Sequence, residues 1–268
     1  MLLAVALAVG ALVGVVSGLI GIGGGVLMVP FLYVLYARLD VPAADSTVLA
    51  HATSLAVIVP TAARGLVGYR GMGLVRWRAA AILAVTAALS SALAARLAVR
   101  VPAEALRVGF GVFLLVVASD LLLRREKVGS KPIEGRASAL YAALLGVPVG
   151  ALSALLGVGG GVVAMVGMYY VLRLRFDVLA PTSLAVVAVT ASAGALSYLF
   201  TPAGPLPFGW VVGHVDLGHA LPLAAGAVAT APLGVRLNRR LPARQLQLVF
   251  AVVLLAIGAD IVWENLLR

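Results

Sequence analysis

The amino-acid sequence predicts an all-α polytopic membrane protein made of two homologous inverted repeats. Three observations lead to this prediction: the hydrophobic content, long segments without charge, and an internal repeat. Of the 268 residues, 63% are hydrophobic and only 11% are charged, and the mean hydropathy is +1.12. A soluble domain of this size cannot bury so much apolar surface, so a bilayer is the expected surrounding.

Two long segments, 1–37 and 137–172, contain no charged residue. A membrane crossing needs roughly 20 apolar residues, and lipid forces the backbone to satisfy its own hydrogen bonds, which favours helices. The expected spans are 2–20, 46–68, 77–98, 103–123, 138–156, 179–200, 218–237 and 243–265. Glycine breaks at 21–25 and 157–161 precede two short expected helices, 26–37 and 162–174.

The same pattern occurs twice along the chain. Residues 21–26 read Gly-Ile-Gly-Gly-Gly-Val, and 157–162 read Gly-Val-Gly-Gly-Gly-Val. Thr-Ser-Leu-Ala-Val at 53–57 recurs unchanged at 182–186. Recurrence of several motifs in the same order indicates repeated structural units. We therefore predict a first repeat at 1–123, a polar linker at 124–136 and a second repeat at 137–268.

The positive charges favour one of two ways of threading the chain through the membrane. If each glycine break only kinks a spanning helix, the 20 Lys and Arg residues divide evenly between the two sides. If the break turns the chain back as a re-entrant hairpin, one side keeps only Arg38, Arg96, Arg100, Arg107 and Arg268. The positive-inside rule favours the hairpin and makes the linker cytoplasmic. An odd number of crossings in each half then makes the repeats inverted.

The paired glycine breaks are the strongest indication of a binding site. Interrupted helices at matching positions in two halves are typical of transporter sites, and a helix N-terminus attracts anions through its N–H groups and dipole. A competing interpretation is that these glycines only let helices pack closely. The candidate anion-binding glycines are Gly23, Gly24, Gly25, Gly159, Gly160 and Gly161.

Polar residues near the breaks complete the candidate site. Hydroxyl groups could donate to an anion, or they could bond to a carbonyl one turn earlier. His51 is a candidate carrier of a coupling proton or a packing residue, and the second repeat has Ala180 at its place. Arg64 is a candidate anion contact, against the alternative that it extends to the lipid headgroups. The candidate hydroxyl residues are Thr53, Ser54, Thr182, Ser183, Ser17 and Ser153.

Several other functions are disfavoured by the sequence. The chain has no cysteine, which excludes disulfides and thiolate chemistry. There is no His-Glu-x-x-His motif and no acidic pair at catalytic spacing within the spans, so we predict no enzyme, cofactor or metal. The net charge of +10 comes from scattered residues rather than one basic face, so nucleic acid is not an expected partner. The expected partners are the lipid bilayer, a small anion and a coupling proton; a homo-oligomer is left open.

The glycine motif at 18–32, its echo at 154–168 and His-Ala-Thr-Ser at 51–54 resemble the TauE/SafE sulfite exporter family, also called the 4-toluene sulfonate uptake permease family. The resemblance implies a multi-pass inner-membrane permease for sulfur-containing anions such as sulfite or an organosulfonate, driven by an ion gradient. Val166-Gly167 and Ala180-Pro181 depart from the first repeat's Pro30-Phe31 and His51-Ala52. A passive anion channel, or a transporter of another small anion, stays an alternative.

Overall fold

The computed structural model describes residues 2–123, 135–203, 210–238 and 243–266, and it is almost entirely helical. The first half contains α1 (Leu2–Ile20), α2 (Gly25–Arg38), α3 (Ala43–Gly68), α4 (Trp77–Ala98) and α5 (Ala103–Leu123). The second half contains α6 (Gly135–Leu156), α7 (Gly161–Tyr170), α8 (Phe176–Leu199), α9 (Leu217–Asn238) and α10 (Ala243–Leu266). Each expected span is present within a few residues, and most of the linker lies outside the described residues.

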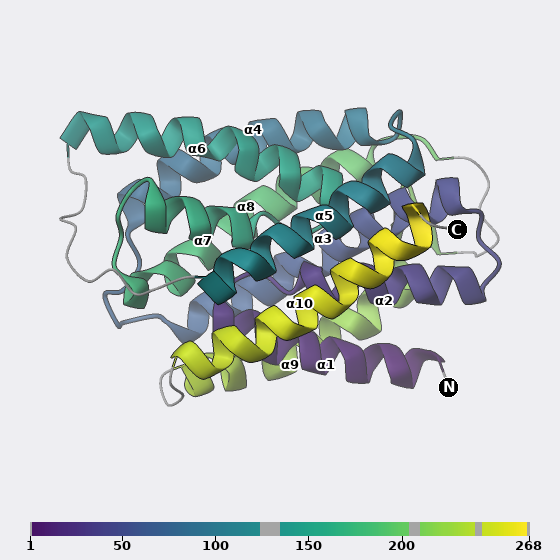
Figure 1. The fold of residues 1–268 in the computed structure, drawn as a ribbon, viewed down its shortest axis with the longest axis horizontal. Coiled ribbons are helices and arrows are strands. Elements are labelled where there is room, and N and C mark those ends of the chain that lie inside the picture. Colours follow the sequence, from purple (N-terminus) through teal and green to yellow (C-terminus); the bar gives the residue numbers. More distant parts are fainter. Residues whose placement is uncertain (1, 124–134, 204–209, 239–242, 267–268) are drawn as a thin grey trace.

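Within the described ranges, seven helices are long and apolar enough to cross a membrane: α1, α3, α4, α5, α6, α8 and α9. Figure 1 shows the helices running along one common direction, with both termini at the same end of the bundle. After the first glycine turn, α2 returns toward this end, and α7 lies toward the opposite end (Figure 1). The chain therefore folds back at each break, as the hairpin threading predicts.

Each half packs two of its helices against helices of the other half. The helix α1 packs along α9 of the other half, and α4 packs along α6 (Figure 1). Glycines make both contacts close, because a Cβ at Gly10 would strike the Leu223 carbonyl and a Cβ at Gly146 would strike the Leu83 carbonyl. Small residues allow such approaches between membrane helices. The same contact thus occurs twice, with the halves swapped, which is the arrangement expected of two related repeats.

The central helices of the bundle are α3 and α8. About three quarters of the apolar window of each is buried, 78% in α3 and 72% in α8, against 39% in each of the other spanning helices. Those two helices pack against each other and carry the Thr-Ser pairs. The outer helices instead present exposed apolar side chains such as Leu89 and Val116, which suit contact with lipid.

One element was not predicted from the sequence. A two-stranded antiparallel hairpin, β1 (Val211–Val212) and β2 (Val215–Asp216), precedes α9 at the end of the bundle that carries the termini. Strands of two residues carry no periodic signal that a sequence pattern could reveal. The helix expected at 162–174 is also shorter than expected, because α7 ends at Tyr170.

Candidate functional site

Both glycine breaks adopt the same backbone conformation. Three glycines in each turn have positive φ: Gly21, Gly23 and Gly24 at 81°, 83° and 84°, and Gly157, Gly159 and Gly160 at 66°, 76° and 76°. Side chains with a Cβ rarely adopt this left-handed region, whereas glycine does so freely. The motif therefore builds two matching turns, each of which leads directly into a short helix.

The fourth glycine of each motif brings the two turns into contact. A Cβ added at Gly25 would lie 2.6 Å from the Gly157 carbonyl oxygen, and one added at Gly161 would lie 2.5 Å from the Ile22 carbonyl oxygen. Each contact joins the fourth glycine of one motif to one of the first two residues of the other motif. All residues of both turns are buried. The two glycine breaks therefore meet inside the bundle.

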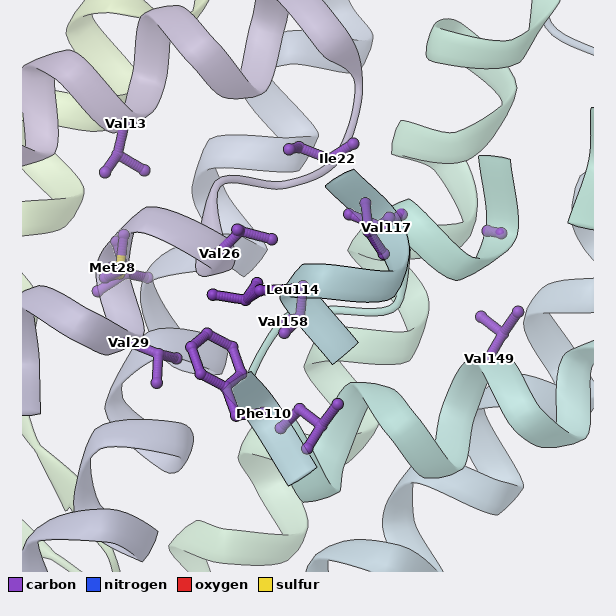
Figure 2. Close-up of a cluster of buried hydrophobic side chains, with 14 of the residues drawn as sticks. Val13, Ile22, Val26, Met28, Val29, Phe110, Leu114, Val117, Val149 and Val158 are labelled. Carbon is purple, nitrogen blue, oxygen red and sulfur yellow. The ribbon is translucent and has the colours of Figure 1, made fainter. Parts of the chain in front are cut away.

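Two aliphatic side chains fill the space beside the turns. The side chains of Ile58 on α3 and Val187 on α8 lie within van der Waals contact of a Cβ added at Gly23. They also lie within contact of a Cβ added at Gly159. Ile22, Val26 and Val158 of the turns point into the apolar cluster in Figure 2. Apolar side chains therefore pack directly against both glycine turns.

The helix N-termini at the turns face one another from opposite directions. The chain of α2 runs from the turn toward the end with the termini, and α7 runs the other way (Figure 1). The first backbone bonds of these helices reach back to Gly24 and Gly160. The N–H groups before them have no partner within the helix, and each N-terminus carries roughly half a positive charge.

Two serines one turn before the breaks have free hydroxyl groups. The side chains of Ser17 and Ser153 are fully buried, and their Oγ atoms have no hydrogen-bond partner among the described residues. Their Cβ atoms lie 3.6 Å and 3.3 Å from where a Cβ would stand at Gly24 and Gly160. Buried hydroxyls without a partner are costly and uncommon in native proteins. Their duplication beside the two turns suits a ligand that both repeats contact.

The predicted Thr-Ser pairs make structural hydrogen bonds that the sequence does not reveal. Thr53 Oγ1 accepts the Asp216 N–H at 3.0 Å, just before α9, and Thr182 Oγ1 accepts the Arg76 N–H at 3.1 Å, just before α4. These bonds join the two repeats at equivalent places. The serine hydroxyls do not bond to their own helix: Ser54 donates to the Gly157 carbonyl at 2.8 Å and Ser183 to the Gly161 carbonyl at 3.0 Å.

His51 is fully buried against the second turn, where a Cβ at Gly157 would lie 2.6 Å from its Cα. Its Nε2 hydrogen-bonds the Tyr33 hydroxyl, and the Leu155 backbone also lies against the imidazole. Arg107 lies over the Tyr33 ring, with Cζ 4.9 Å from the ring centroid. The sequence alone assigns Arg107 only to a side of the membrane and does not select Tyr33. Both residues lie far from His51 in the chain, and only the packing of the helices brings the three together.

Arg64 does not join this group. It is exposed near the end of α3, whereas the turns are buried. Exposure there fits a side chain that reaches the headgroup region. Elsewhere in the ranges that the structure describes, no three His, Asp or Glu residues gather as a metal site would require.

Comparison with known proteins agrees with this architecture. The model of the family described as "Sulfite exporter TauE/SafE" matches residues 6–261. The chain is 24% identical to "Probable membrane transporter protein YunE" of Bacillus subtilis, over 96% of both chains. It is 26% identical to a "Probable membrane transporter protein" of Methanocaldococcus jannaschii, over 96% of this chain and 94% of that one. No solved structure matches it significantly. The chain belongs to the TauE/SafE sulfite exporter family of membrane transporters.

Proposed function

We propose that the chain is a secondary transporter of a small sulfur-containing oxyanion, such as sulfite or an organosulfonate, that binds between the two glycine turns. One observation carries the proposal. At each of the two turns, a helix begins close to a buried serine whose hydroxyl has no hydrogen-bond partner among the described residues. Helix N-termini and hydroxyl donors together suit an oxyanion and need no buried cation.

The geometry favours a transporter over a passive channel. Because Ile58 and Val187 fill the space at the turns, an anion can enter only if the central helices move apart. Inverted-repeat transporters achieve this by rocking one bundle against the other around a fixed site. The anion would then reach each side of the inner membrane in turn, with an ion gradient supplying the driving force. The basic end of the bundle, where the linker attaches, would face the cytoplasm.

A stability assay with serine variants tests the proposal. Sulfite, thiosulfate and small sulfonates should raise the melting temperature of the purified wild-type protein, because a ligand that binds only the folded state stabilises it. The double variant Ser17→Ala/Ser153→Ala should lose most of this effect. Its melting temperature without anion should stay the same or rise, since the two hydroxyls have no partner to lose.

Ser91→Ala serves as the matched control. Ser91 is also buried with a free hydroxyl, but it lies on α4 against Gly150 and Gly194. This variant should keep the full anion response. Equal melting temperatures of the wild-type protein with and without every anion of the panel would refute the binding proposal. A response that survives in the double serine variant would place the anion elsewhere.

A further inference from the structure

A half-buried arginine stands at the end of the bundle that carries the termini. Arg107, in the second turn of α5, donates from Nε to Thr47 Oγ1 at 2.7 Å and from Nη2 to Ser46 Oγ at 2.9 Å. Among the described residues it has no carboxylate partner, and its remaining terminal nitrogen has no hydrogen bond. An unneutralised guanidinium in a membrane protein indicates a functional site, and its planar fork matches an oxyanion.

A continuous set of contacts leads from this guanidinium to the second glycine turn. Arg107 lies over the face of Tyr33, and the Tyr33 hydroxyl bonds to His51, which is packed against Gly157. Phe110, one turn after Arg107, places its ring 6.2 Å from that of Tyr33 and 6.4 Å from that of His51. Phe110 and Val29 belong to the same apolar cluster as Tyr33, so α5 packs against this set (Figure 2).

The set exists in only one of the two repeats. The second repeat has Tyr169 where the first has Tyr33, and Phe250 where the first has Phe110. It replaces His51 by Ala180 and Arg107 by Gln247. The glycine turns and free serines are duplicated, whereas the cation and the imidazole are not. The two repeats therefore differ chemically at these positions.

We propose that Arg107, Tyr33 and His51 form an oxyanion recognition site on the route between the termini-bearing face and the glycine turns. This inference rests on the proposed transport of a small oxyanion. The guanidinium binds the anion first through paired N–H donors. The Tyr33 hydroxyl and the imidazole of His51 then supply the next polar groups toward the Gly157 turn. At the equivalent positions the second repeat has Ala180 and Gln247, so we expect the recognition to be one-sided.

Sided transport measurements test this assignment. The wild-type chain is free of cysteine, so a Pro202→Cys tag at the termini-bearing end and a membrane-impermeant maleimide report the orientation of the protein in liposomes. Inorganic sulfite is supplied to one face and then to the other. Arg107→Gln should raise the apparent KM about tenfold at the termini-bearing face, and Arg107→Lys should raise it less, because lysine keeps the charge without the planar fork. The KM at the opposite face should stay unchanged.

Three further variants complete the test. Arg100→Gln removes the same charge from an exposed position at the same end and should leave both KM values unchanged. Tyr33→Phe should raise the KM at the termini-bearing face, and its repeat counterpart Tyr169→Phe should not.

If the wild-type protein moves no sulfite or sulfonate, the proposed function fails and this inference falls with it. If the wild-type protein transports sulfite but Arg107→Gln behaves like Arg100→Gln, or changes both faces equally, only the recognition site is refuted.

Should Arg107→Gln fail to give a monodisperse protein in detergent, the Tyr33→Phe and Tyr169→Phe pair carries the test alone. Each of these two variants removes one hydroxyl and keeps the ring, so packing is retained. A rise in KM for both tyrosine variants, or for neither, contradicts one-sided recognition.

Discussion

The glycines of the two turns are required for two different physical reasons. Gly23, Gly24 and their counterparts hold positive φ angles, so any side chain there strains the backbone. Gly25 and Gly161 are helical, and they are required because the opposite turn occupies the place of a Cβ. The sequence motif predicted a turn in each repeat. It could not reveal that the two turns touch, since this contact depends on how the halves pack.

Gly25→Ala tests the second of these reasons, the contact between the two turns. Alanine favours a helix over glycine by about 1 kcal/mol, but the new methyl group would press on the Gly157 carbonyl, and overpacking costs about 1–3 kcal/mol. We therefore expect a net loss of stability, measured by thermal unfolding in detergent. Gly109→Ala is the control, because that helical glycine has open space around it, and its melting temperature should rise or stay the same. Equal shifts in both variants would contradict the contact between the turns.

At the scale of elements, the spans could be predicted closely because apolar runs and their breaks determine where membrane helices begin and end. The helices α4 and α5 have the bounds expected from the sequence. Which helices and side chains contact one another was not predictable in the same way. Thr53 bonds to the backbone before α9 and Thr182 to the backbone before α4, and each pair is far apart in the chain. Arg107 and Tyr33 meet for the same reason, through packing of α5 on α2 and α3.

Ile58→Ala should loosen the closed contact between α3, α8 and the turns. The change removes side-chain volume beside both Gly23 and Gly159. A cavity at this place should let small anions cross without coupling, so sulfite-loaded liposomes should lose their content faster in the absence of an ion gradient. Ile82→Ala on α4, away from the turns, is the comparison for a general loss of packing. Identical leak rates for Ile58→Ala and the wild-type protein would show that this side chain does not close the pathway.

At the scale of the whole molecule, the topology places the two ends of the bundle on opposite sides of the membrane. Pro202 lies just after α8, and Arg78 lies at the start of α4. The hairpin threading assigns these two exposed positions to opposite sides, whereas the kinked threading assigns them to the same side. The charge distribution further predicts that the Arg78 side is cytoplasmic.

Single cysteines measure this topology directly. Pro202→Cys should react with an impermeant maleimide in intact cells, and Arg78→Cys should react only after the membrane is permeabilised. The cysteine-free wild-type chain gives the background. Labelling of both positions from outside would contradict the hairpin threading, and the reverse pattern would contradict the assignment of the cytoplasmic side.

The packing of α1 on α9 and of α6 on α4 has a consequence for how such a chain could have arisen. The glycine-lined face of α1 is covered by α9, and the corresponding face of α6 is covered by α4. A polypeptide of the first half alone would leave the faces of α1 and α4 that contact the other half uncovered, and its single glycine turn would have no opposite turn to meet. An ancestral half-length protein would therefore have needed a second copy in the opposite orientation, and joining the two genes would have fixed their ratio and direction of insertion.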